Sequence, residues 1–306
     1  MTELSSIMFH DLHLDEKNKT QGSVDSEEFK KIIDHIRAIH EIENATNIKS
    51  LNNQQIINKI FFTFDDGLKS QFQIGNQLLN ENDIRACFFI HTAPLSGEYD
   101  VHQILRIFRN STIFKSVEGF NIEFLDFLYK NLDEEKIVKL ETSFINSQYL
   151  EQFTFYSEND RKLRYVRDFY FDHNDYKNLS LDFIKSYEVN VKSLVETTYM
   201  DESSILKLHN MGHYIGLHSH SHASNLKTLE YEKQRFEIQK NIDVLTDIID
   251  EKPLAMSYPS NSYNEETIDI LKIKGIKFGF RADTLVNKSP YELSRIDARI
   301  LLDSLG

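Results

Sequence analysis

Short apolar runs alternate with amphipathic stretches in the first and last thirds of this 306-residue chain. The short runs predict buried strands, and apolar residues spaced three and four apart predict helices. Strands are expected at 5–9, 59–64, 84–90, 214–217, 254–258, 276–280 and 295–301. Helices are expected at 25–40, 68–82, 203–211, 227–249 and 265–274. Strands that alternate with helices predict an α/β fold built on a parallel sheet or barrel.

The middle of the chain has a different pattern, because its apolar and aromatic residues recur at helical spacing without strand-like runs between them. Helical segments are expected at 101–108, 122–132, 134–153, 161–170 and 181–199. We therefore expect an α/β body formed by residues 1–94 and 201–306, with a helical insertion at 95–200. The insertion either packs on the body as support or caps an active site, and the sequence leaves both open.

Two adjacent carboxylates, Asp65 and Asp66, follow the second expected strand, and Gly67 turns the chain away. Neighbouring acids repel each other, so one is driven toward protonation unless a cation neutralises the pair. A metal ion is the simplest such cation. The alternative is that both acids cap the helix that begins near residue 68.

A histidine cluster, His218, His220 and His222, follows the strand expected at 214–217. Imidazole and carboxylate together suit zinc or a similar divalent ion, and a catalytic site usually has three protein ligands and an open position. In an extended strand His218 and His222 would lie roughly 13 Å apart, too far for one ion. The chain must therefore turn after residue 217 if both bind, with His220 between the two ligands. Otherwise they are ordinary polar loop residues.

Composition limits the classes of partner. The net charge of −13, from 48 acidic and 35 basic residues, argues against nucleic acid or an anionic membrane as partner. The single cysteine, Cys87, excludes an internal disulfide and fits a reducing compartment. No basic segment with a long apolar run opens the chain, and no apolar run reaches about 18 residues. A cytoplasmic protein without a membrane span is expected, with its oligomeric state open.

Three motifs in this order resemble the polysaccharide deacetylase family, of the NodB-homology or carbohydrate esterase 4 type. Residues 63–67 read TFDDG, as in the family's first motif, and residues 218–222 are similar to its H-S/T-x-x-H motif. Residues 256–267 are similar to the Y-P-Y-G-x-Y-N-E-E-T stretch of one branch, whose leader strand resembles residues 6–13. The resemblance omits residues 95–200. It implies a distorted (β/α)7 barrel of the NodB type with a large helical insertion.

The same resemblance implies a function. A member of this family removes an N-acetyl or other N-acyl group from an amino sugar with the help of a divalent metal ion, most commonly Zn²⁺. By analogy the metal ligands are Asp66, His218 and His222, and Asp65 is the general base. The backbone N–H of Ser260 is expected to face the oxyanion. The bound metal polarises the acyl carbonyl and lowers the pKa of a water molecule.

Two positions depart from the wider family. Its third motif begins with an arginine that orients the base, where this chain has Ser257, and Arg295 is the expected substitute in the catalytic machinery. Its late L-x-H motif supplies a histidine general acid, but no histidine follows His222 in this chain. Another group must therefore protonate the leaving amine. The candidates are His10, His13 and Asp65.

Three functions stay open. The first is a cytoplasmic deacetylase of a small or carrier-linked precursor of a surface polysaccharide. The second is a related metal-dependent amide hydrolase with a non-sugar or formyl substrate. The third is a non-catalytic carbohydrate-binding relic, against which the intact Asp65 argues, because a relic has no need of a general base. His91 either lines the site or ends its strand in an ordinary polar contact, and His10 and His13 either line the site or lie in a loop.

Overall fold

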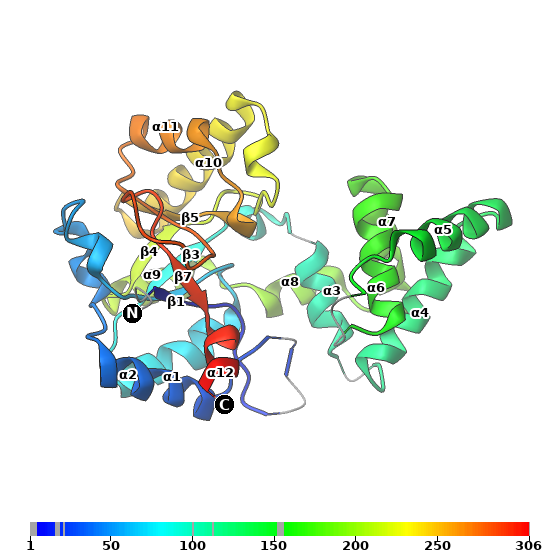
Figure 1. Ribbon diagram of the computed structural model, residues 1–306, viewed down its shortest axis with the longest axis horizontal. Helices are drawn as coiled ribbons and strands as arrows, with labels where there is room; N and C mark the ends of the chain where they lie inside the picture. The colour runs from blue at the N-terminus through cyan, green and yellow to red at the C-terminus, as the bar shows by residue number, and fades with distance from the viewer. Residues whose placement is uncertain are drawn as a thin grey trace. The chain divides into compact units, whose positions relative to one another are not determined.

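The computed structural model describes residues 5–15, 19–20, 22–99, 101–111, 113–151 and 156–305 (Figure 1). The chain forms two compact units, Met1–Asp100 with Val195–Gly306, and Val101–Leu194. The junctions expected at 94/95 and 200/201 lie close to these boundaries.

The first unit contains one sheet of seven parallel strands in the order β6-β5-β4-β3-β2-β1-β7. The strands are β1 (Ser6–Phe9), β2 (Phe62–Phe64), β3 (Cys87–Ile90), β4 (Tyr214–Leu217), β5 (Ala255–Ser257), β6 (Phe278–Phe280) and β7 (Arg295–Asp297). The segment before β7 reaches back to β6, where the Leu293 N–H donates to the Gly279 carbonyl at 2.8 Å. The nearly closed parallel sheet confirms the expected barrel of the NodB type.

Helices connect the strands of the first unit. They are α1 (Ser26–Ile39), α2 (Asn76–Glu81), α9 (Glu202–Asn210), α10 (Tyr231–Ile249), α11 (Glu265–Ile273) and α12 (Ala298–Leu305). Short 3₁₀ segments are η1 (Ala45–Lys49), η2 (Ile56–Asn58), η4 (Ala93–Ser96), η6 (Leu226–Thr228) and η7 (Pro259–Asn261), and η3 (Gln71–Gly75) is a π-helix. Helix α1 begins at a capping box of Asp25 and Glu28 and buries one apolar face, as its sequence pattern predicts.

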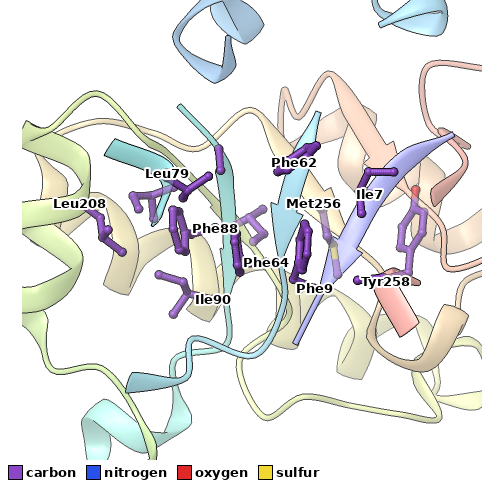
Figure 2. Packing of buried hydrophobic residues seen from close by; sticks show 14 of the residues in the cluster. Ile7, Phe9, Phe62, Phe64, Leu79, Phe88, Ile90, Leu208, Met256 and Tyr258 are labelled. Atoms are coloured by element: carbon purple, nitrogen blue, oxygen red, sulfur yellow. The ribbon is translucent and has the colours of Figure 1, made fainter. Parts of the chain in front are cut away.

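Alternate residues of each strand point to opposite faces of the sheet, so the core has two layers. One set of alternate residues packs between the sheet and the helices, including Phe9, Phe64 and Phe88 (Figure 2). The other set fills the barrel, including Phe89 and Phe280. Each buried phenylalanine contributes about 1.5–3 kcal/mol relative to an exposed one. Successive side chains of a strand point to opposite faces of the sheet. Residues two positions along from an inner residue therefore also point into the barrel.

The second unit is entirely helical within the part of it that the structure describes. Its helices are α3 (Val101–Arg109), α4 (Val117–Lys130), α5 (Glu134–Ser147), α6 (Glu158–Tyr165), the π-helix η5 (Val166–Tyr170), α7 (His173–Ser186) and α8 (Val191–Thr198), the last of which continues into the first unit. Phe183 lies at the centre of an aromatic core, with its ring centroid 4.7 Å from that of Phe124 and 6.1 Å from that of Phe108. Among the described residues, no helix combines the length and the apolarity that crossing a bilayer requires.

Several expected elements were wrong in their extent. The strand expected at 295–301 ends at Asp297, whose carboxylate accepts the Arg299 N–H at 2.8 Å, and helix α12 begins there. The helix expected at 181–199 is two helices, α7 and α8, and the one expected at 227–249 starts as a 3₁₀ turn. Part of the helix expected at 134–153 lies outside the described residues. Its described part ends at Ser147.

His213 gives the fold a pH-dependent stability. The Ala86 N–H donates to its Nδ1 at 3.1 Å, so the buried ring is neutral, and Nε2 lies 3.1 Å from Asn76 Oδ1. Burial and the nearby Arg85 charge lower the pKa of His213 from 6.5 to about 4. The neutral ring is favoured in the folded state, so its stabilisation is complete above pH 6.5 and is lost as the pH falls toward 4. The loss amounts to about 3 kcal/mol of unfolding free energy.

The measurement is urea unfolding at pH 7 and pH 4.5 for the parent protein and for His213→Asn, whose side-chain oxygen keeps an acceptor for the amide. The variant is expected to lose less stability between the two pH values than the parent. The exposed His40 provides the matched control, His40→Asn. Equal pH dependence in all three proteins would contradict the prediction.

Candidate functional site

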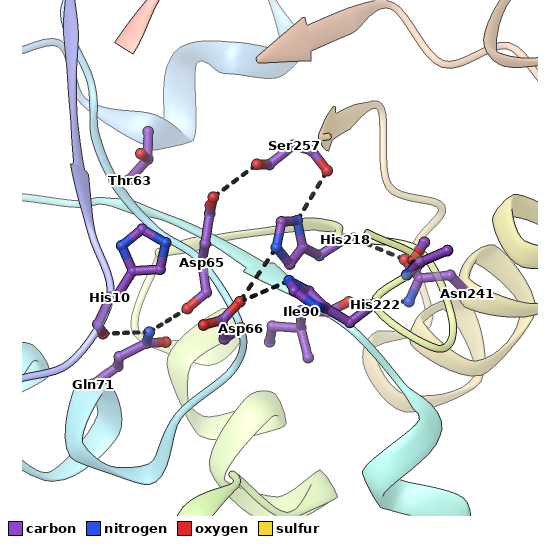
Figure 3. Close-up of polar contacts among 12 residues, drawn as sticks. His10, Thr63, Asp65, Asp66, Gln71, Ile90, His218, His222, Asn241 and Ser257 are labelled. Atoms are coloured by element: carbon purple, nitrogen blue, oxygen red, sulfur yellow. Dashed lines mark hydrogen bonds and ion pairs between the residues drawn. The ribbon is translucent and has the colours of Figure 1, made fainter. Parts of the chain in front are cut away.

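Asp66, His218 and His222 come together at the carboxyl ends of β2 and β4. Asp66 Oδ1 lies 3.3 Å from His218 Nε2 and 3.3 Å from His222 Nε2 (Figure 3). One ligand atom from each residue lies within 4.8 Å of the others. No other group of three such residues is found in the described part of the chain.

Hydrogen bonding shows that this triad suits a cation. His218 Nδ1 lies 2.9 Å from the Ser257 carbonyl, which only accepts, so Nδ1 carries the proton. In the neutral ring Nε2 is then a lone pair that faces the carboxylate of Asp66, another acceptor. A cation between the two resolves this conflict. A backbone partner of this kind is also what fixes the tautomer of metal-bound histidines.

The two distances from Asp66 agree with the ligand spacing of one tetrahedral ion. Two ligands about 2.1 Å from such a zinc ion lie about 3.4 Å apart. The carboxylate of Asp66 is 3.3 Å from each of the two imidazole nitrogens. The hydrogen bonds and charges of the histidines outweigh burial and hold the pKa of Asp66 well below its usual range, so it is an anion there.

The turn expected after Leu217 is present. Ser219 and His222 both adopt left-handed backbone conformations, with φ of 57° and 56°. Such conformations are uncommon outside glycine and occur often at functional sites. Asn241 of α10 accepts the His218 N–H at 2.8 Å and donates to the Ile90 carbonyl at 3.0 Å. It therefore ties the ends of β3 and β4 together behind the triad.

Asp65 stands next to the triad but is bound by different partners. Arg295 donates to both of its oxygens at 2.7 Å, and Ser257 Oγ donates to one of them at 2.9 Å. Burial alone would raise the pKa of Asp65, but the Arg295 guanidinium and the neighbouring imidazoles lower it below its usual value. Arg295 of β7 thus contacts Asp65, the acid that the resemblance would pair with the third-motif arginine. Ser257, at that arginine's position, joins the same network.

Arg295 holds the Asp65 carboxylate, and its removal has a large predicted cost. Arg295→Met leaves the buried Asp65 carboxylate without its countercharge, which costs about 3–5 kcal/mol of unfolding free energy. Urea unfolding at pH 7 measures it. The same substitution in an Asp65→Asn background is expected to cost less, because no buried anion is then left unpaired. An equal cost in both backgrounds would assign the effect to packing instead of charge.

Ser260 lies in the loop after β5, in η7. Ser260 and the following Asn261 are both left-handed, with φ of 51° and 55°. Asn261 occupies the glycine position of the Y-P-Y-G motif, and asparagine tolerates this conformation better than most residues. Asn261 Nδ2 also donates to Asp283 at 2.9 Å. Ser260 is exposed, and within the described residues no hydrogen bond joins its side chain to the triad.

The remaining histidines differ in their contacts and in their exposure. His220 is bound through Nδ1 to Thr92 Oγ1 at 2.9 Å and is not part of the triad. His13 is buried with Nδ1 2.9 Å from Ser23 Oγ. His91 is buried and lines the site, since its ring centroid is 5.5 Å from that of His222. His10 is partly exposed beside Asp65 and Asp66.

Sequence reasoning missed three supporting residues, Gln71, Asn241 and Asp297. Gln71 is buried in the π-helix η3, a type of helix that is frequent at functional sites, and donates to the carbonyls of His10 and Asp65. Asn241 lies on the buried apolar face of α10. A polar residue at an apolar-face position was the available signal for both. Asp297 carried no signal, because its segment was expected to be a longer strand.

Comparison with known proteins gives one sequence match. Residues 168–279 match the model of the polysaccharide deacetylase family, a range that includes His218 and His222 and does not reach Asp65. No curated protein sequence matches the chain.

Solved structures share the fold at low identity. A Streptococcus pyogenes deacetylase, PplD in complex with acetate, is 13% identical, with 100% of each chain covered and a TM-score of 0.53. IcaB from Ammonifex degensii is 11% identical over 97% of this chain and 91% of its own, with a TM-score of 0.53. A de-N-acetylase from Aggregatibacter actinomycetemcomitans is 10% identical over 96% and 95%, with a TM-score of 0.53. The chain is therefore similar to the polysaccharide deacetylase family over residues 168–279, and it shares its fold with solved deacetylases.

Proposed function

We propose that this protein is a metal-dependent carbohydrate N-deacetylase, which hydrolyses an N-acetyl or other N-acyl group of an amino sugar. The observation that carries the proposal is the pairing of a cation-binding triad with a separate buried carboxylate. Asp66, His218 and His222 have the donor set of a catalytic zinc site, and Asp65 beside them is held by Arg295 instead. A protein that only binds carbohydrate does not need one acid for a metal and a neighbouring acid held apart from it.

The triad would hold the metal, most commonly Zn²⁺, through one carboxylate oxygen and two imidazole nitrogens. When bound, such an ion supplies a Lewis acid that polarises the acyl carbonyl and lowers the pKa of a water molecule. The protein backbone fixes the imidazole of His218 for this task, because the Ser257 carbonyl holds its Nδ1–H.

Asp65 would take the proton of the attacking water as general base. Its lowered pKa keeps it ionised at neutral pH, so it is ready to accept. Arg295 and Ser257 orient the carboxylate through three hydrogen bonds. The left-handed loop at Ser260 would present its backbone N–H to the oxyanion, as an oxyanion hole requires.

The substrate we propose is small or carrier-linked, such as a nucleotide-linked or lipid-linked precursor of a surface polysaccharide. The acidic composition disfavours an anionic polymer as partner. A cytoplasmic location, which the single buried Cys87 suits, is part of the same proposal.

Acetate release tests the function. Purified protein is loaded with zinc and incubated with nucleotide-linked, lipid-linked and free N-acetylated amino sugars, and acetate and free amine are quantified together. We expect equal amounts of both products from at least one sugar, and none after chelation. Formate or another acid as the product would favour a related amide hydrolase. No product from any sugar, with one equivalent of zinc bound, would favour a carbohydrate-binding relic.

A further inference from the structure

The helical unit presents a cluster of aromatic side chains at its surface. Phe169, on the π-helix η5, is 65% exposed. Its ring centroid lies 5.3 Å from those of Tyr149 and Tyr165, and the Tyr149 and Tyr165 centroids are 5.8 Å apart. We call these three rings the aromatic platform. Single exposed apolar residues are ordinary on a protein surface, whereas a contiguous cluster with polar groups at its edge marks a binding site.

The backbone that carries the platform adopts uncommon conformations. Tyr149 lies between Gln148 and Leu150, which are both left-handed, with φ of 48° and 57°. Such a conformation costs a non-glycine residue on the order of 1–3 kcal/mol, and it recurs where a protein holds a ligand. Phe169 belongs to a π-helix, a rare type of helix that is frequent at functional sites. The backbone on both sides of the platform thus has features typical of a functional site.

Planar polar groups lie beside the rings and are held in place. Arg167 donates to both oxygens of Asp168, at 2.6 and 2.9 Å, and the Tyr149 hydroxyl donates to Asp168 Oδ2 at 2.6 Å. Burial and this hydrogen bond raise the pKa of Tyr149 to about 12, so its hydroxyl stays a donor at neutral pH. Arg161 donates to the Tyr149 carbonyl at 3.4 Å and lies 3.6 Å from Glu151. The side chains of Arg167 and Asp168 are each about one-third exposed, so a ligand can reach them.

The charges of these groups favour a neutral ligand. Arg167 is paired with Asp168, and Arg161 with Glu151, so the four groups carry no net charge that would attract a phosphate. Paired guanidinium and carboxylate groups offer donors and acceptors in fixed planes, which match the neighbouring hydroxyl groups of a sugar. The C–H face of a sugar ring is weakly positive and complements the negative face of an aromatic ring.

We propose that the aromatic platform is a saccharide-binding site on the helical insertion, formed by residues other than those of the metal triad. A sugar ring would lie against Phe169, and its hydroxyl groups would hydrogen-bond to Asp168 and Arg167. The choice of sugar rests on the proposed function: the carrier-linked substrate would be an oligosaccharide with N-acetylated amino sugars, one of which the platform binds. Binding at the platform requires neither metal nor turnover.

Calorimetric titration of the full-length, zinc-loaded protein tests the proposal, in an Asp65→Asn background so that the probe is not consumed. The probes are the tetrasaccharides of N-acetylglucosamine and of N-acetylgalactosamine, and uridine monophosphate. Phe169→Ala should weaken the binding of at least one tetrasaccharide by about tenfold, because it removes the stacking surface. Asp168→Asn should weaken the same binding by less. Urea unfolding establishes that both variants fold.

Phe236→Ala is the matched control, because Phe236 is a phenylalanine of similar exposure, 61%, on α10 of the other unit. It should bind the tetrasaccharides within about twofold of the parent. The barrel is unchanged in Phe169→Ala, so a loss specific to that variant belongs to the platform.

Four results would overturn the inference. They are no binding of either tetrasaccharide by the parent, unchanged binding in Phe169→Ala, binding of uridine monophosphate that Phe169→Ala abolishes, and a dimer in sedimentation that Phe169→Ala dissociates. The last two would make the platform a nucleotide site or a contact between two copies of the chain. A parent that releases no acetate but binds a tetrasaccharide through Phe169 would refute the proposed function and leave the saccharide site standing.

Discussion

Asp65→Asn should leave the protein folded and zinc-loaded while kcat/KM for acetyl release falls by about 10²–10⁴-fold. Arg295 binds both carboxylate oxygens of Asp65 in the parent. The amide of the variant cannot take a proton from water, but it still offers one oxygen to Arg295. Because Asp65 lies outside the triad, the metal site keeps its three ligands. Steady-state kinetics and zinc analysis of the same preparation measure both effects.

The matched control for this change is Asp269→Asn, which alters an aspartate on α11 that pairs with Lys272 at the surface. It is expected to keep the parental rate. Normal turnover by Asp65→Asn would remove the general base from the proposed mechanism. Loss of zinc from it would instead make Asp65 a ligand.

The parent is expected to retain one equivalent of zinc after dialysis, and His218→Ala and His222→Ala are each expected to lose it. Each substitution removes one of three protein ligands. The loss of affinity should therefore exceed the 10- to 100-fold typical of losing an outer-shell partner. Activity falls with zinc occupancy. Metal analysis after dialysis and calorimetric titration with zinc give stoichiometry and affinity independently of any substrate.

His220→Ala is the control for the metal ligands, because His220 lies between the two in sequence and its ring is bound to Thr92 instead. We expect it to retain one zinc per chain. Retention of zinc by His218→Ala or His222→Ala would disprove the triad as the site. Loss of zinc from His220→Ala would mean that the loop conformation, and not the ligand set alone, controls binding.

The parts of this protein that the sequence determined are those that local pattern encodes. Alternating apolar runs and amphipathic stretches specify the strands and helices of the barrel, and its parallel form follows from their order. The two acids after β2 and the histidine pair after β4 could be recognised because each sits within a few residues of a strand end. The spacing of His218 and His222 also required the turn that Ser219 begins.

Tertiary structure decided everything that depends on barrel closure and strand register. Arg295 reaches Asp65 across 230 residues of sequence, because β7 lies next to β1 and packs its inner side chains into the barrel. The contact of His10 with Asp297 and the hydrogen bonds from Gln71 to the carbonyls of His10 and Asp65 arise in the same way. Local periodicity carries no information on such pairings, since they depend on which strand is the neighbour and on which residue lies opposite. The motifs therefore pointed to the candidate ligands and to Arg295, while the contacts of Gln71 and Asp297 were fixed only by the fold.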